Sequence, residues 1–174
     1  AASDVYKRQL HIEEETMKQK SRFCTARRIL IFWTLFIGLG AVAGALAMLL
    51  DPSGKSMGMD AMLPYFQVLP FADVVFQDFT FSGWALLIVN GLTNLTAAGL
   101  LLAKKHSGVV LGGVFGVTLM LWICIQFYMF PPNFMSTTYF FFGLAQAATG
   151  YAAWVFEKQE AFRVDISDLS LIHI

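Results

Sequence analysis

The fold is decided by the sequence ILIFWTLFIGLGAVAGALAMLL at residues 29–50, which contains no charged side chain and no histidine. Three runs of the same kind follow, at residues 81–103, 108–130 and 136–156. As a helix, each run is long enough to cross a hydrocarbon layer about 30 Å thick, which takes roughly 20 residues. A soluble domain of 174 residues could not shield four helices that are apolar on every side. The sequence therefore predicts an integral membrane protein.

All charged residues lie outside the four runs, in a chain that is 57% hydrophobic and has a formal net charge of zero. Lysine and arginine cluster before the first run, between the second and third, and after the fourth: Lys18, Lys20, Arg22, Arg27, Arg28, Lys104, Lys105, Lys158 and Arg163. Lys55 is the only lysine or arginine in the two remaining connections. Because cytoplasmic segments are enriched in these residues, we expect a multi-pass protein of the bacterial cytoplasmic (inner) membrane with both termini in the cytoplasm.

Two of the connections are very short. Lys104-Lys105-His106-Ser107 joins the second run to the third, and Pro131-Pro132-Asn133 joins the third to the fourth. Such connections force consecutive helices to lie side by side and antiparallel. The predicted fold is all-α: a four-helix transmembrane bundle in up-down-up-down order at residues 29–156, with cytoplasmic tails at residues 1–28 and 157–174.

Small residues indicate how the helices pack. Gly40 and Gly44 form a Gly-x-x-x-Gly pair in the first run, and Gly108, Gly112 and Gly116 form two overlapping pairs in the third. Such pairs let helix backbones approach closely in lipid, where no hydrophobic drive joins helices. We expect packing within one chain, with homo-oligomerisation as the alternative.

The two ends of the chain resemble translated sequencing-adapter sequence. They read AASDVYKRQ at residues 1–9 and DLSLIHI at residues 168–174. We expect these segments to carry no native structure or function, and they are excluded from the predicted fold.

Residues 51–80 form a long apolar connection between the first and second runs, on the predicted outer side. Asp51-Pro52-Ser53-Gly54 is typical of a type I turn that ends the first helix. Asp60 could begin one short helix and Pro70 another, in which Phe71, Val74, Val75 and Phe79 share a face: an amphipathic pattern. The segment either lies on the outer leaflet, covers the bundle as a lid, or folds back between the helices.

Uncharged polar residues lie inside the predicted helices. Asn90 and Asn94 fall on one stripe of the second run, which we expect to face the interior of the bundle. Gln146 in the fourth run is about as deep as Asn90, roughly 13 Å from the outer surface at 1.5 Å per residue, and these two are predicted partners. Gln126 lies nearer the surface, in the third run. The four amides either join helices through hydrogen bonds or line a ligand-binding site.

The missing residue types exclude several functions. Proton-coupled drug export requires a carboxylate within the membrane, and a b-type haem requires facing histidines; the four runs contain neither. Cys24 and Cys124 fall on opposite sides of the predicted threading and form no Cys-x-x-Cys pair, so a thiol-disulfide oxidoreductase would have no dithiol. We therefore expect a non-catalytic protein with no haem and no nucleic-acid partner.

One cluster in the outer connection points to a metal. Met57, Met59 and Met62 lie close together in the sequence, and soft thioethers select Cu(I). Methionine is also a flexible residue that fills irregular apolar surfaces. Both interpretations are compatible with the sequence.

Several of these features together resemble the DoxX-like group of small bacterial four-helix membrane proteins. They are the glycine-rich first run ending in Asp51-Pro52-Ser53-Gly54, the proline-bearing loop, and a second run leading from Asn90-Gly91-Leu92 through Gly99-Leu100-Leu101-Leu102 into a basic turn. The resemblance implies a membrane-embedded subunit or partner of a redox system linked to quinone or thiol chemistry.

The sequence supports three functional hypotheses. The first is a non-catalytic protein that binds an apolar ligand such as lipid or quinone, oriented by Asn90, Asn94, Gln126 and Gln146, or that docks on a larger membrane complex. The second is the redox subunit implied by the resemblance. The third is Cu(I) handling by the outer methionines.

Overall fold

A computed structural model describes residues 2–172, and the side chains of residues 6, 7 and 9–162. The described residues contain helices and turns and no strands. The elements are α1 (Ala2–Leu50), η1 (Lys55–Met57), η2 (Asp60–Val68), α2 (Ala72–Val75), α3 (Thr80–Leu86), η3 (Leu87–Leu92), α4 (Thr93–Leu102), α5 (His106–Met129) and α6 (Phe134–Ile172). The predicted all-α class is confirmed. The adapter-like residues 1, 173 and 174 lie outside the described residues.

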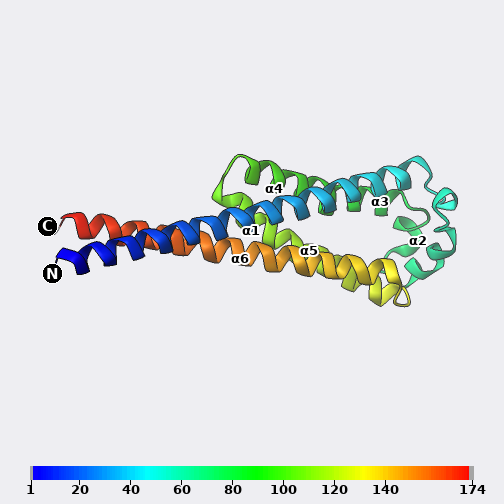
Figure 1. The fold of residues 1–174 in the computed structure, drawn as a ribbon. Coiled ribbons are helices and arrows are strands. Elements are labelled where there is room, and N and C mark those ends of the chain that lie inside the picture. Colours follow the sequence, from blue (N-terminus) through cyan, green and yellow to red (C-terminus); the bar gives the residue numbers. More distant parts are fainter. Residues whose placement is uncertain (1, 173–174) are drawn as a thin grey trace.

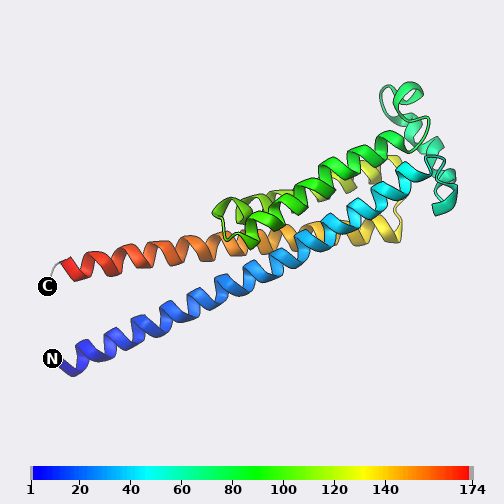
Figure 2. The same ribbon diagram turned by 90° about the horizontal axis from the view of Figure 1, so that it is seen from above.

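The long helices form four rods, because α3, η3 and α4 continue one another without a break from Thr80 to Leu102. The first rod, α1, packs against α6 and against the α3–η3–α4 rod. The α5 rod packs against α4 and α6, which closes the ring (Figure 1). The N- and C-terminal ends of α1 and α6 lie at the same end of the molecule and separate from each other toward the termini (Figure 2).

Within the part of the chain that the structure describes, three helices are long and apolar enough to cross a membrane: Gln9–Leu50, Thr80–Leu102 and His106–Met129. They contain the first three predicted runs. The fourth run, residues 136–156, lies inside α6 but is not among them. Its serine, threonines and Gln146 reduce its apolar character. The structure thus supports a helical protein with at least three helices of transmembrane length.

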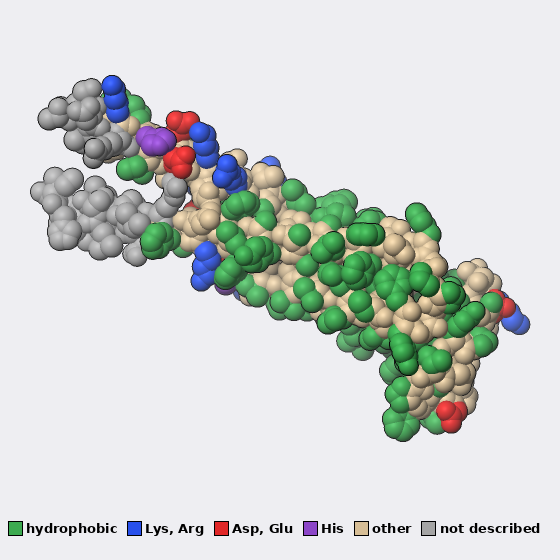
Figure 3. Space-filling model, turned by 90° about the horizontal axis from the view of Figure 1, so that it is seen from below, with side chains coloured by type: hydrophobic (Ala, Val, Ile, Leu, Met, Phe, Trp, Pro, Cys, Tyr) green, Lys and Arg blue, Asp and Glu red, His purple; other side chains and the backbone are tan. Residues whose placement is uncertain are grey.

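The surface agrees with the predicted separation of charge from apolar sequence. Hydrophobic side chains cover the middle of the molecule, whereas charged side chains gather toward its two ends (Figure 3). Large aliphatic side chains on this middle section are exposed, for example Leu39, with 59% of its surface exposed, and Leu121, with 61%. Proteins in water rarely expose so continuous an apolar belt, and its extent is compatible with contact with lipid.

The predicted turn after the first run is confirmed. Helix α1 ends at Leu50, and the Gly54 N–H donates to the Asp51 carbonyl across 3.0 Å. Gly54 has a φ of 72°, a left-handed conformation that glycine adopts without strain. The Asp51 carboxylate accepts hydrogen bonds from the Ser53 hydroxyl at 2.6 Å and from the Ser56 N–H at 2.8 Å. These bonds fix the first residues of the outer segment.

The rest of the outer segment folds over one end of the rods. The predicted short helix from Asp60 is present as η2, and the one after Pro70 as α2. The predicted shared face of Phe71, Val74, Val75 and Phe79 is wrong. Phe79 is 1% exposed whereas Phe71 is 79% exposed, because α2 ends at Val75 and the chain turns before Phe79.

An aromatic cluster anchors the outer segment. The Phe66 ring contacts the rings of Phe76, Phe79 and Phe130, with centroids 5.3 to 5.7 Å apart. Phe130 follows the end of α5, so the cluster joins the segment to the rods. The outer segment is therefore packed as a cap, although Phe71 and Val74 still point away from the protein.

The glycines of the third run pack within the chain, as predicted. A Cβ atom on Gly116 would lie 2.5 Å from the Ala147 backbone nitrogen, and one on Gly108 would lie 2.6 Å from that of Leu101. The pair in the first run behaves differently, because a Cβ on Gly40 or Gly44 would meet nothing nearer than 3.4 Å. The closest backbone approaches at these glycines are thus those of α5 with its neighbours.

Candidate functional site

A buried polar contact joins three of the rods. The Gln146 Nε2 of α6 donates to the Asn94 Oδ1 of α4 at 2.7 Å and to the Gly112 carbonyl of α5 at 2.8 Å. Asn94 in turn donates through Nδ2 to the Asn90 carbonyl at 2.9 Å. Gln146 and Asn94 have no exposed surface. In a bundle without a hydrophobic drive between helices, such bonds fix how far each helix slides and rotates.

The structure confirms the inward stripe of the second run but changes its pairing. Asn90, Asn94, Ala97 and Leu101 are all at most 1% exposed. Gln146 meets Asn94, however, and the predicted pairing with Asn90 is wrong. The depth argument assumed a regular α-helix, whereas residues Leu87–Leu92 form a π-helical turn, which alters the rise and rotation.

Asn90 lies inside that π-helical turn, and its side chain is 1% exposed. Neither its Nδ2 nor its Oδ1 has a hydrogen-bond partner in the structure, and the same holds for the Gln146 Oε1. A buried amide without partners is unfavourable by about 1–3 kcal/mol. Among the buried amide side chains that the structure describes, Asn90 is the one that makes no hydrogen bond to another helix.

Gln126 lies apart from the other predicted site residues. Its Oε1 accepts a hydrogen bond of 3.0 Å from the Ser136 hydroxyl, beside the turn between α5 and α6. The turn is closed by the Asn133 Oδ1, which accepts from the Ser136 N–H at 2.8 Å. The structure thus brings Asn90, Asn94 and Gln146 into one region and places Gln126 in another.

Met57, Met59 and Met62 lie in the outer segment, residues 51–80. Met57 is in η1 and is 38% exposed, Met59 precedes η2, and Met62 lies within it. The Met62 N–H donates to the Met59 carbonyl at 2.8 Å, so a helical turn holds these two close. The described residues contain no group of three or more His, Cys, Asp or Glu side chains that could hold a metal ion. Cu(I) binding stays a prediction.

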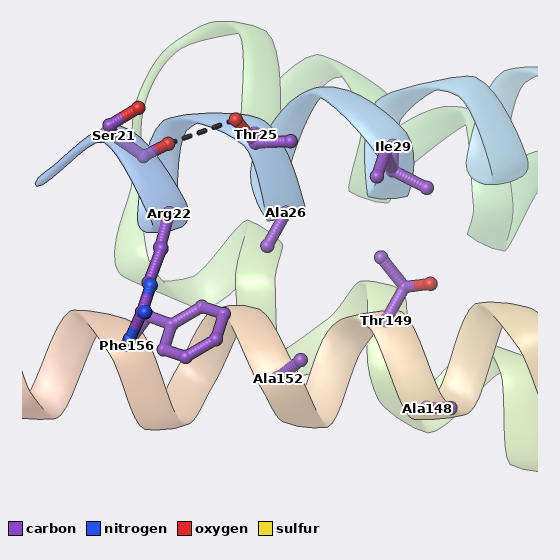
Figure 4. Close-up of a pocket in the computed structure, with 9 residues that line it drawn as sticks. All are labelled: Ser21, Arg22, Thr25, Ala26, Ile29, Ala148, Thr149, Ala152 and Phe156. Atoms are coloured by element: carbon purple, nitrogen blue, oxygen red, sulfur yellow. Dashed lines mark hydrogen bonds between the residues drawn. The ribbon is translucent and has the colours of Figure 1, made fainter. Parts of the chain in front are cut away.

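Sequence reasoning missed a groove of about 490 Å³ between α1 and α6. Figure 4 shows the residues that line it, from both helices: Ser21, Arg22, Thr25, Ala26, Ile29, Ala148, Thr149, Ala152 and Phe156. Most of this lining is apolar, and Arg22 is its one charged member. The available signal was a set of alanines near the ends of the first and fourth runs, beside the basic cluster.

Contacts between the two helices mark the ends of this groove. On the side of the termini, the Gln19 side chain, which is 8% exposed, donates to the Gln159 Oε1. On the other side, the rings of Trp33 and Phe142 meet with centroids 5.5 Å apart. Between these contacts the facing residues Ala26, Ala148 and Ala152 are too small to fill the space.

A second groove, of about 270 Å³, lies between α5 and α6. Its lining includes Gly113, Val117 and Gly150, and it has no charged residue. Nearby, His106 at the start of α5 approaches Glu157 of α6, with 2.6 Å between Nδ1 and Oε2. The two grooves thus differ in polarity: only the one between α1 and α6 combines an apolar wall with a cation.

No family model, curated protein or solved structure matches this chain. The resemblance to DoxX-like proteins therefore stays a prediction.

Proposed function

We propose that this chain is a four-helix transmembrane bundle of the bacterial inner membrane, with both termini cytoplasmic. The three helices of transmembrane length support three of the crossings. The packing of α6 against α1 and α5 supports the fourth, because Gln146 and Ala153 of α6 are fully buried among them. A helix packed along its whole apolar length against membrane helices would share their depth.

The function that the geometry supports best is non-catalytic binding of a ligand with an apolar chain and a polar head, such as a lipid or a quinone. The observation that carries this proposal is the groove between α1 and α6. Its wall is apolar where it borders the predicted membrane interior, and it ends in polar side chains at the basic boundary. Ligand sites commonly combine an apolar lining with a few polar groups.

Asn94 and Gln146 have a different role in this proposal. Their hydrogen-bonding groups are largely committed to each other and to the Gly112 carbonyl, so they position α4, α5 and α6. They act on the ligand only by holding the helix that forms one wall of the groove.

The test is to fill the groove. Ala148 lies on the groove wall and is exposed, so Ala148→Leu adds bulk there without entering the core. The control is Ala43→Leu, the same substitution at an exposed position of α1 outside the groove. The three proteins are purified in a mild detergent, the phospholipid and quinone that remain bound are extracted from each protein, and both are measured by mass spectrometry.

We expect Ala148→Leu to retain less of the specifically bound lipid or quinone than the wild type or Ala43→Leu. Equal retention in all three proteins would contradict the proposed function.

A further inference from the structure

We infer that the ligand of the groove between α1 and α6 is an anionic phospholipid whose phosphate is bound by Arg22. This inference rests on the proposed function, since it names the ligand class of the same groove. It is carried by the position of one cation in an otherwise uncharged lining.

The groove crosses the predicted boundary between membrane and cytoplasm. Ile29 begins the first apolar run, and Arg22 lies seven residues before it, which is about 10 Å along a helix at 1.5 Å per residue. On α6 the lining ends at Phe156, the last residue of the fourth run. A phospholipid has the same order of parts, because its phosphate lies at the interface and its acyl chains run inward.

The apolar part of the lining suits an acyl chain. Ile29, Ala148 and Ala152 present only hydrocarbon, and Ala26 forms a floor that is 7% exposed. The small side chains leave room between two helices that Trp33 and Phe142 hold apart on one side. An acyl chain in this part of the groove would bury apolar surface of both helices that otherwise faces mobile lipid.

The polar end suits an anion better than a neutral head. The Thr25 hydroxyl, one turn from Arg22, donates to the Ser21 carbonyl at 2.9 Å, whereas Thr149 lies opposite Ile29 at the other end of the groove and donates to the Ala145 carbonyl at 2.6 Å (Figure 4). These hydroxyl protons are therefore committed to the backbone, and the strong donors available to an anion come from Arg22. Arg22 extends from α1 toward α6 in Figure 4, and no ion pair with another described side chain neutralises it.

The guanidinium group matches a phosphate in both charge and shape. It presents parallel N–H groups that can bind two phosphate oxygens at once. A quinone offers neutral carbonyl oxygens, which can accept a hydrogen bond from Arg22 but lack the attraction between opposite charges that a phosphate gains. Basic pockets between membrane helices on the cytoplasmic side are a recurrent way of binding anionic headgroups.

The experiment measures binding of phosphatidylglycerol, phosphatidylethanolamine and ubiquinone to the full chain in detergent micelles by native mass spectrometry. We expect the wild type to bind phosphatidylglycerol about fivefold more tightly than phosphatidylethanolamine, the difference that one basic residue provides near a membrane surface. Arg22→Gln should remove this preference. The control is Arg28→Gln, which removes a charge from the same basic cluster at an exposed position outside the groove.

The outcomes separate this inference from the proposed function. The inference would be overturned if the wild type showed no preference for phosphatidylglycerol. It would also be overturned if Arg22→Gln kept the preference, or if Arg28→Gln lost it to the same extent. Tighter binding of ubiquinone than of either lipid would overturn it too, while leaving ligand binding in the groove intact. The proposed function itself fails if Ala148→Leu binds all three probes as the wild type does.

Discussion

Helix α6 meets its two neighbours in different ways. On the side of α5 the backbones approach so closely that a Cβ on Gly116 would lie 2.5 Å from the Ala147 nitrogen and 2.8 Å from the Gly143 oxygen. On the side of α1 the two helices meet through the rings of Trp33 and Phe142 and through the Gln19 and Gln159 side chains. The first contact brings the backbones together and leaves only the smaller groove of about 270 Å³, whereas the second contains the groove of about 490 Å³.

The difference shows that small residues alone do not close a contact between helices. Ala26, Ala148 and Ala152 line the groove, and they are hardly larger than the glycines between α5 and α6. The α1–α6 contact stays open because bulky or long side chains at its ends keep the backbones apart. The α5 and α6 backbones approach closely because glycine lies opposite glycine, as Gly113 does opposite Gly150, and only the smaller groove remains beside them. A binding groove and a tight interface can thus share one helix.

The largest effect is expected where the α5–α6 contact is tightest. Gly116→Ala places a methyl group against the α6 backbone, which cannot yield as a side chain can. We expect the free energy of unfolding to fall by about 1–3 kcal/mol, as for overpacking elsewhere. The measurement is an equilibrium titration of detergent-solubilised protein with dodecyl sulfate, followed by circular dichroism.

Gly99→Ala is the matched control for this experiment, since a Cβ there would meet nothing within 4 Å. Its stability should be unchanged or slightly raised, because alanine favours a helix more than glycine does. Equal destabilisation by both substitutions would show that the contact is looser than described.

The next effect concerns the buried amides, which join α6 to α4 and α5. Gln146→Leu removes the hydrogen bonds to Asn94 and to the Gly112 carbonyl, and we expect it to destabilise the protein by about 1 kcal/mol. Asn90→Leu should be neutral or stabilising, because the Asn90 amide has no partner to lose. The same unfolding titration compares the two variants. A greater loss of unfolding free energy in Asn90→Leu than in Gln146→Leu would contradict this division of roles.

A smaller effect is expected on the open side of α6. Gln19→Ala removes the side-chain bridge to Gln159 near the chain ends, where it supports little of the packed interior. We expect a loss of less than about 1 kcal/mol, the usual range for one hydrogen bond. Amide hydrogen exchange in residues 155–162 should nevertheless become faster. Lys20→Ala, at an exposed position on the same helix, should leave exchange in that segment unchanged.

The smallest effect is expected outside the α5–α6 and α1–α6 contacts, in the turn at residues 51–54 with which the outer segment begins. Hydrogen bonds from the Ser53 hydroxyl and the Ser56 N–H lower the pKa of the Asp51 carboxyl from 3.8 to about 2. Because the folded-state pKa is lowered, the stabilisation is fully present above the unfolded value and is lost as the pH falls from about 4 to 2. Relative to the intrinsic chemical rate of exchange at each pH, amide exchange in residues 53–58 should accelerate over that interval.

Asp51→Asn tests this assignment. The variant should show faster exchange in the turn at neutral pH and no acceleration between pH 4 and 2. An unchanged acid transition in the variant would assign it to another group.

Much of the molecule could be predicted from local patterns. Long uncharged runs identified the helices of transmembrane length, and the spacing of Asn90 and Asn94 identified an inward face. The turn at Asp51 followed from residue preferences that act over four positions. These features depend on neighbours in the chain, so a single sequence contains the information they need.

The candidate site could be predicted only in part. The amides that meet were among those selected, but the partner of Gln146 was wrong because a π-helical turn changed the register of the second rod. The groove was missed altogether. Arg22 was recognised as part of a charge pattern, whereas its position opposite Phe156 depends on how two helices distant in sequence lie together (Figure 4).

By itself, the sequence determined the all-helical class, the apolar lengths of the helices, and the confinement of charge to their ends. These properties follow from hydrophobicity and from hydrogen bonding within each helix. Only the tertiary structure decided which side of α6 packs backbone against backbone and which side contains the larger groove. That choice depends on the shapes of side chains facing one another across the contacts, where a missing Cβ brings two backbones together and a pair of aromatic rings holds them apart.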